Sequence, residues 1–152
     1  MTDASDAPVD PDIAQRIQDS FDRQRVMDTL GARLGEVHLG EVEILLPFRE
    51  ALTQQHGFTH AGILSAIMDS ACGYAALTLA PPEAGVLAVE FKVNFLTPAL
   101  GELLVARAHV VRAGRKLTVC TADAFAVVDG EDKPVATMLS TIMVVDGPGL
   151  GG

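Results

Sequence analysis

Twenty consecutive residues near the middle of the chain, 61–80, carry a single charge, that of Asp69, and are apolar on almost every side. A segment of this length is long enough to cross a bilayer. However, an aspartate at mid-span costs roughly 2.5–3.5 kcal/mol on insertion scales, and no Lys or Arg between residues 49 and 92 could orient a span. We therefore predict a helix that is buried on most sides within a globular domain and that ends before Pro81.

The segments on either side of this helix alternate apolar and polar residues with the period of half-buried strands. Residues 32–37 and 41–48 predict a hairpin before it. After it, four further strands are predicted at 86–96, 104–110, 120–126 and 135–145. In 86–96, the strand period places Leu87, Val89 and Phe91 on one face. The small residues of 120–126 would let a helix backbone approach the sheet closely.

A further helix is predicted near the N-terminus, with Asp10 as its N-cap, Pro11 as its first residue and Gly31 as its end. Short turns between the strands make them antiparallel. The sequence therefore predicts an α+β fold, in which one antiparallel sheet of five to six strands wraps around one long central helix. A single domain would span residues 11–146, between a disordered segment at 1–10 and a flexible tail at 147–152.

Composition limits the partners of the chain. Its 152 residues suit one domain, and its formal net charge of −9 gives it no electrostatic reason to bind nucleic acid or an anionic membrane. Cys72 and Cys120 both lie in apolar runs and are predicted to be reduced core residues. No basic, apolar secretory leader opens the sequence, and we expect a cytoplasmic protein.

The start of the central helix and Asp69 are the most informative chemical features. Free N–H groups near His60 and Ala61 would lie at the positive end of the helix dipole and could stabilise an oxyanion. Ala61 and Asp69 are eight residues apart, or about 12 Å along a helix, whereas one reacting atom must lie about 3 Å from both groups. If both serve one substrate, they must come from different subunits of a two-fold dimer.

These residues resemble a known family. The spacing Gln54-x-x-Gly57-x-x-His60-Ala61-Gly62, followed by Asp69, is similar to that of hotdog-fold acyl-CoA thioesterases. Within the 4-hydroxybenzoyl-CoA thioesterase superfamily, the phenylacetate-degradation branch is the most similar. The resemblance extends from about residue 21 to residue 145. It implies the hotdog fold, hydrolysis of an acyl-CoA thioester, with aryl-acyl-CoA as one candidate, at a site shared across a dimer interface, and a homodimer assembled into a homotetramer.

The resemblance also implies roles for individual residues. Asp69 takes the place of the carboxylate that acts as nucleophile or as general base on water, and Gln54 lies near the substrate or that water. His60 organises the loop, and the amide of Ala61 polarises the thioester carbonyl, with Gly62 as a second donor. Ala61 replaces a glycine of the family pattern. It keeps the N–H, but its methyl group narrows the site.

Further contacts are predicted around these residues. Gly57 in the loop, and Ser70 and Gly73 near Asp69, are expected to line the substrate site. Gly73 stands where some relatives carry a Ser or Thr that supports the carboxylate. Arg112, Arg115 and Lys116 form either a basic rim for the phosphates of coenzyme A or an ordinary solvated hairpin.

We expect no metal site, because the four histidines show no paired ligand spacing, and no cofactor beyond the coenzyme A of the substrate. Two other functions stay open. The same scaffold carries enoyl-thioester hydratases and dehydratases, although their His and acid constellation is not found here. A non-catalytic acyl-CoA-binding protein would share the fold without the chemistry.

Overall fold

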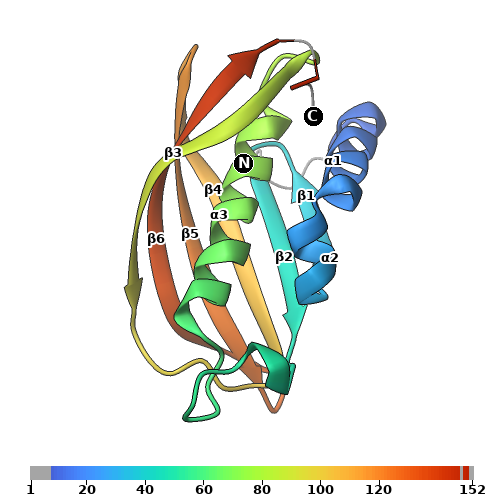
Figure 1. The fold of residues 1–152 in the computed structure, drawn as a ribbon. Helices are drawn as coiled ribbons and strands as arrows, with labels where there is room; N and C mark the ends of the chain where they lie inside the picture. The colour runs from blue at the N-terminus through green and yellow to red at the C-terminus, as the bar shows by residue number, and fades with distance from the viewer. Residues whose placement is uncertain (1–7, 148, 151–152) are drawn as a thin grey trace, which may run out of the picture.

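The computed structural model describes residues 8–147 and 149–150, in which one antiparallel sheet packs against helices on one of its faces (Figure 1). The strands of the described chain follow the order β1-β2-β4-β5-β6-β3. Their bounds are β1 Arg33–His38, β2 Glu41–Pro47, β3 Ala84–Phe95, β4 Leu103–Ala113, β5 Leu117–Val128 and β6 Glu131–Asp146. The helices are α1 Pro11–Arg23, α2 Arg25–Leu30, the short 3-10 helix η2 Glu50–Leu52 and α3 Ala61–Thr78. The predicted fold class is confirmed.

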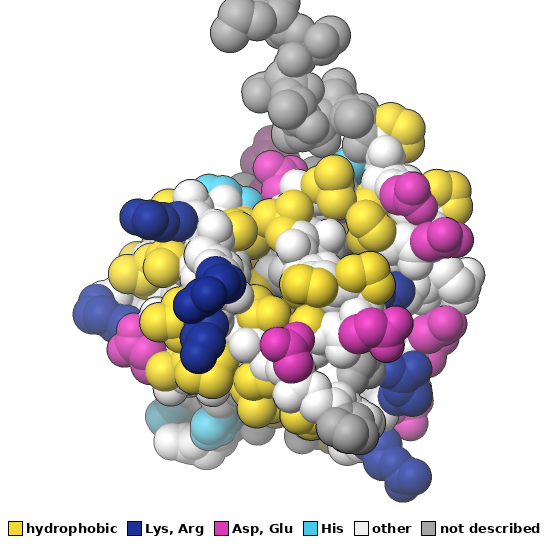
Figure 2. Space-filling model, turned by 90° about the horizontal axis from the view of Figure 1, so that it is seen from above, with side chains coloured by type: hydrophobic (Ala, Val, Ile, Leu, Met, Phe, Trp, Pro, Cys, Tyr) yellow, Lys and Arg dark blue, Asp and Glu magenta, His cyan; other side chains and the backbone are white. Residues whose placement is uncertain are grey.

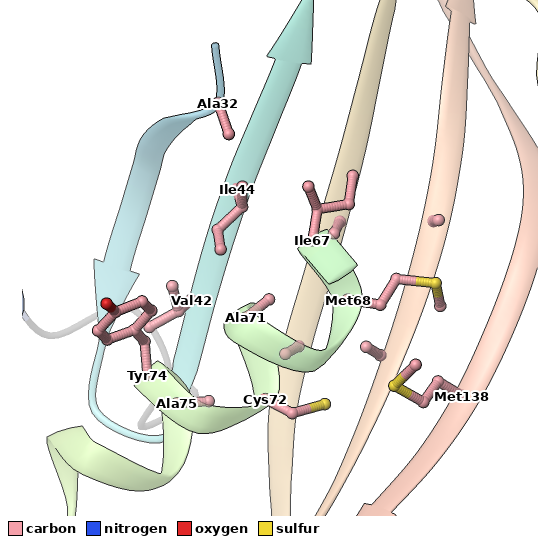
Figure 3. Packing of buried hydrophobic residues seen from close by; sticks show 14 of the residues in the cluster. Ala32, Val42, Ile44, Ile67, Met68, Ala71, Cys72, Tyr74, Ala75 and Met138 are labelled. Carbon is pink, nitrogen blue, oxygen red and sulfur yellow. The ribbon is translucent and has the colours of Figure 1, made fainter. Parts of the chain in front are cut away.

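Helix α3 lies in the curve of the sheet and forms the core with it (Figure 1). By length and composition it is the one described helix that could cross a membrane, but it is instead packed within the fold. Figure 3 shows Met68 and Cys72 of α3 pointing towards the strand that carries Met138. The inward side chains of β5 are all small and almost fully buried: Cys120, Ala122, Ala124 and Ala126. This confirms that the small-residue strand receives the helix.

The N-terminal helix differs from the prediction because it is broken in two. Asp10 caps α1 as expected, with its side chain accepting from the Asp12 N–H at 2.8 Å. Gln24, however, has an extended backbone (φ −79°, ψ 92°) that ends α1 and begins α2. The second helix stops at Gly31, whose φ of 76° is left-handed and suits a residue without a β-carbon.

Strand β3 lies at one edge of the sheet and departs from simple alternation. A bulge between Ala88 and Glu90 shifts its register against β6. Ala88 and Phe91 therefore face the buried Ile142 and Ser140, whereas Leu87 shares the outer face with Met143. The prediction that Leu87 and Phe91 lie on one face was wrong, because the extra residue reverses the alternation.

The predicted termini fall largely outside the described residues, which exclude 1–7, 148, 151 and 152. Residues 8–10 precede α1 without regular structure, and β6 runs to Asp146. Strand β6 begins at Glu131 rather than at the predicted residue 135, because the turn at 129–130 leads directly into pairing with β5.

Arg16 of α1 fixes the turn that follows α3. Its guanidinium donates to the carbonyls of Ala80 at 3.3 Å and Pro81 at 2.9 Å, and also to that of Ala84. These carbonyls belong to the end of the helix and the start of β3, where few backbone partners exist. Arg16 therefore ties the N-terminal helix to both elements.

Replacing this arginine tests that role. Arg16→Ala should lower the free energy of unfolding by about 1–2 kcal/mol, because three carbonyls lose a charged donor. Arg16→Lys, whose ammonium can bind fewer of the three carbonyls, should have a free energy of unfolding between those of Arg16→Ala and the wild type. The measurement is chemical denaturation, with Arg33→Ala, an exposed arginine on β1, as the control. Equal effects of Arg16→Ala and Arg33→Ala would contradict the assignment.

Candidate active site

The start of α3 is held by its preceding loop. The N–H of Thr59 donates to the Ala99 carbonyl and that of His60 to the Leu52 carbonyl, both at 3.0 Å. The side chain of His60 then caps the helix, since its Nδ1 accepts from the Gly62 N–H at 2.8 Å. The imidazole fills the role that Ser, Thr, Asp or Asn usually fills at an N-cap. His60 therefore joins the loop to the first turn of the helix through both its backbone and its side chain.

The cap decides which amides remain free for a ligand. The N–H of Gly62 is taken by His60, which corrects the expectation that Gly62 serves as a second donor. Within the described part of the chain, the N–H of Ala61 has no acceptor. Ala61 therefore presents one unpaired donor at the positive end of an eighteen-residue helix.

Residues 53–59 form the compact loop before this helix. Thr53 and Thr59 make an isolated antiparallel bridge, and Gln54 N–H donates to the Phe58 carbonyl at 2.8 Å. Gly57 has a φ of 84°, which explains a glycine at this turn. The side-chain oxygen of Gln54 accepts from the His56 N–H, so the amide nitrogen is the end of that side chain left for other contacts.

A cavity of about 460 Å³ opens beside the first turn of α3. Gln54, Phe58 and Ala61 line it from the loop and the helix, and Phe95 and Leu96 line it from the end of β3. Apolar walls with a few polar groups are typical of small-molecule sites. Two predicted site residues, Gln54 and Ala61, are thus brought together here, whereas Gly57 does not line the cavity.

Asp69 lies two turns further along α3, in a second cavity of about 340 Å³. Ser70 and Gly73 line the same space, and Val86 and Ala88 line it from the start of β3. The Oδ1 atom of Asp69 is buried and has no hydrogen-bond partner among the described residues. Burial raises the pKa of this carboxyl above its usual range.

No lining residue is shared by the two cavities. Ala61 and Asp69 stand eight residues apart on one straight helix, which separates them by about 12 Å. One chain therefore does not bring the Asp69 carboxyl and the Ala61 amide to a common reacting atom. The distance argument made from sequence holds in the structure of the single chain.

Sequence reasoning missed the contribution of the N-terminal helices. Ser20, Arg23 and Gln24 line the cavity of Asp69. Gln24 donates to the Ser70 hydroxyl at 3.0 Å and accepts from the Tyr74 hydroxyl at 3.0 Å. The spacing of these three residues, which suits one face of a helix, was a signal in the sequence. Nothing in the spacing indicated that this face meets α3.

The basic residues of the β4–β5 turn lie elsewhere. Arg112, Arg115 and Lys116 are exposed and line neither cavity. In Figure 2, the view from above, basic side chains lie on both sides of the surface, with hydrophobic side chains between them.

The neighbouring Cys120 thiol and burial raise the pKa of Cys72, which makes this thiol poorly suited to act as a nucleophile. Both cysteines are free and buried. In residues 8–147 and 149–150, no three His, Cys, Asp or Glu side chains are placed to hold a metal ion.

Comparison with known families shows to which family this chain is related. The thioesterase superfamily matches residues 56–132, a range that includes the helix start, Asp69 and the following strands. The chain belongs to the thioesterase superfamily. A Halobacterium salinarum protein that carries an esterase name is 33% identical over 113 residues, which cover 71% of this chain and 74% of that protein.

Solved structures extend this relationship. A thioesterase family protein from Silicibacter pomeroyi is 58% identical, with a TM-score of 0.87, over 89% of this chain and 99% of that chain. The Escherichia coli PaaI protein, from the phenylacetic acid degradation operon, superposes with a TM-score of 0.80. That match covers 91% of this chain and 97% of that chain at 18% identity, and it shows the shared hotdog fold.

The imidazole cap can be tested by substitution. His60→Ala should lower the free energy of unfolding by about 1 kcal/mol, because the Gly62 N–H loses its acceptor. His60→Asn, whose side-chain oxygen can accept the same bond, should restore most of that loss. Thermal and chemical denaturation would show it, and equal stability of all three proteins would contradict the cap.

The burial of Asp69 predicts a pH dependence of stability. A raised pKa means that the folded chain holds the proton more tightly than the unfolded chain, so ionisation destabilises the fold as pH rises above the ordinary value of 3.8. Asp69→Asn cannot ionise and should be more stable than the wild type at neutral pH.

This difference should shrink as the pH falls below 3.8, where the wild-type carboxyl is protonated in both states. Denaturation curves over a pH series would measure it, with the exposed Asp123→Asn as the control. A stability difference that does not change with pH would show that ionisation of Asp69 is not its source.

Proposed function

We propose that this thioesterase hydrolyses an acyl-CoA thioester, with aryl-acyl-CoA as one candidate, at two equivalent sites, each built from two subunits. The observation that carries the proposal is the Asp69 carboxyl. One of its oxygens is buried, and the described residues supply it with neither a hydrogen-bond partner nor a compensating charge. A carboxylate held this way costs stability, which is typical of a group kept for chemistry.

The edge strand β3 supports a shared site. This edge strand carries exposed apolar side chains on both faces, with Leu87 (55% exposed) on the outer face and Phe91 (43%) and Phe95 (45%) on the helical face. An unpaired apolar edge favours pairing with a second copy. The start of β3 lines the cavity of Asp69, and its end lines the cavity of Ala61.

Antiparallel pairing of two β3 edges about a two-fold axis places the start of one strand against the end of the other. In such a dimer, the cavity of Asp69 in one subunit adjoins the cavity of Ala61 in its partner. Both half-sites are then completed at once, and each dimer holds two of them.

The chemistry follows from these two groups. The Ala61 N–H donates to the thioester carbonyl and stabilises the oxyanion that forms as the carbonyl carbon is attacked. Asp69 of the other subunit either attacks that carbon or removes a proton from the water that does. When the oxyanion collapses, the carbon–sulfur bond breaks, and the thiolate of coenzyme A leaves. If Asp69 acts as base, the proton that it took from water passes to the thiolate and the free acid is released. If Asp69 acts as nucleophile, the thiolate takes its proton from water, and a second water hydrolyses the mixed anhydride on Asp69 to release the free acid and restore the carboxylate. The raised pKa of Asp69 makes its carboxylate a stronger base.

Gln54 and the basic hairpin complete the proposed site. The side-chain amide nitrogen of Gln54, which shares the cavity of Ala61, orients the attacking water or the carbonyl. Arg112, Arg115 and Lys116 bind the phosphates of coenzyme A, which an acidic protein must attract through a local positive patch.

We also propose that two dimers join through the outer face of the sheet. Leu87, Met143 and Leu117 stand directly opposite one another on β3, β6 and β5, and all three are exposed. A contiguous apolar row of this kind favours burial against another copy. The tetramer would leave the two sites of each dimer on the opposite, helical side.

Subunit complementation tests the shared site. Asp69→Asn removes the base and should lower kcat by about 10²–10⁴-fold. Ala61→Pro removes the N–H donor and should lower kcat by about 10²–10³-fold. Proline suits the first turn of a helix, and His60 before it is already extended (φ −61°, ψ 138°), so the fold should survive.

A mixed dimer of these two variants holds one doubly altered site and one intact site. Random mixing should therefore restore about a quarter of the wild-type activity. Glu50→Pro, at the equivalent position of η2, is the matched control and should keep full activity. If mixed dimers form, as shown by mass spectrometry, but no activity returns, the site is not shared.

The assay also separates the reaction classes. Thiol release from acyl-CoA supports hydrolysis, whereas loss of enoyl absorbance without thiol release indicates a hydratase. Binding of acyl-CoA with neither signal would contradict the proposed function.

A further inference from the structure

The cavity of Asp69 contains a second ionisable side chain that the proposed mechanism does not use. Arg23, in the last turn of α1, is the one Lys or Arg among its lining residues. Apart from Asp69, the lining includes no acid. Arg23 is exposed, and a guanidinium with five N–H donors at the wall of a cavity is suited to a carboxylate or phosphate.

Arg23 has no ion-pair partner among the described residues. The nearby acids of α1 are held by other groups, since Asp19 accepts from Gln15 at 2.7 Å and Asp22 accepts from Gln18 at 2.8 Å. Those bonds leave Arg23 available to a ligand.

The position of Arg23 relative to Asp69 is informative. An arginine close to a carboxyl would lower its pKa, yet burial alone accounts for the shift of Asp69. Arg23 instead acts on Tyr74: burial mainly raises the pKa of that phenol, and Ser20 and Arg23 partly offset the effect. Arg23, Ser20 and Tyr74 thus form a polar group in the lining of the cavity.

We propose that Arg23, with the hydroxyl of Ser20 one turn before it on α1, binds an anionic group of the thioester substrate while its carbonyl lies at Asp69. This inference rests on the proposed function and adds the chemistry of the substrate. Leu77, Val86 and Ile142 line the same cavity and provide the apolar wall along which the carbon chain lies. Arg23 then acts as a specificity-determining residue.

Two sources could supply the anion, a carboxylate at the far end of the acyl group or a phosphate of coenzyme A. A cavity of about 340 Å³ is at the small end of ligand sites. The phosphates are separated from the thioester by the whole pantetheine arm, so the size of the cavity favours the carboxylate of a short dicarboxylic monothioester.

The test compares glutaryl and pentanoyl thioesters, which have equal carbon counts and differ in a terminal carboxylate. Each is made with coenzyme A and with N-acetylcysteamine, which lacks phosphates. In the wild type, the glutaryl thioester should have the higher kcat/KM. Arg23→Gln should lower that preference by about tenfold, and Arg25→Gln, an exposed arginine two residues later, should not.

Loss of the glutaryl preference with both thiols supports the carboxylate source. If Arg23→Gln raises the KM for both coenzyme A thioesters and leaves that for the N-acetylcysteamine thioesters unchanged, the phosphate is the source of the anion. If Arg23→Gln behaves like Arg25→Gln on all four compounds, the inference fails even though hydrolysis continues. A role for Arg23 limited to the helix dipole would change stability and leave this selectivity unchanged.

Binding provides a readout that does not depend on turnover. Dissociation constants of the four compounds are measured by calorimetry with Asp69→Asn and with the double variant Asp69→Asn/Arg23→Gln. The added substitution should weaken binding of the anionic compound by about tenfold. Unchanged binding overturns the role of Arg23, whereas lack of hydrolysis by the wild type overturns the proposed function alone.

Discussion

The close packing of α3 against the small inward side chains of β5 is the contact on which the rest of the structure depends. Cys120 and the alternating alanines after it leave room for the helix backbone, so that Ala71, Cys72 and Ala75 become fully buried. The opposite side of α3 is left to carry Asp69, Ser70 and Gly73 towards a cavity. Were the β5 residues larger, the helix would stand further from the sheet, and both cavities would change shape.

Asp69 shows the tension between stability and chemistry in this fold. A half-buried carboxyl with one buried oxygen that has no hydrogen-bond partner among the described residues destabilises the single chain. The surrounding polar contacts do not reach it, since Gln24 is occupied with Ser70 and Tyr74. Packing in the core around α3 offsets this loss of stability. Enzymes commonly carry destabilising groups of this kind at their active sites.

Much of this architecture could be predicted from the sequence. The long apolar segment fixed the central helix, alternation located the strands, and helix geometry separated Ala61 from Asp69. Features that depend on side chains meeting in space could not be predicted. The break at Gln24 is stabilised by residues 46 and 50 positions away, Ser70 and Tyr74. The cap by His60 uses a residue type that is uncommon at that position, and it removes Gly62 as a donor.

The bulge at residues 88–90 has a consequence for how the chain tolerates insertions and deletions. Because one additional residue reverses the two faces of β3, the upstream half offers Leu87 to the outside while the downstream half offers Phe91 and Phe95 to the helical side. Loss of a single residue here would exchange these faces and remove Val86 or Phe95 from its cavity wall. The two cavities therefore depend on the exact number of residues in β3, just as the proposed chemistry depends on the carboxyl of Asp69, although no atom of the bulge takes part in a reaction.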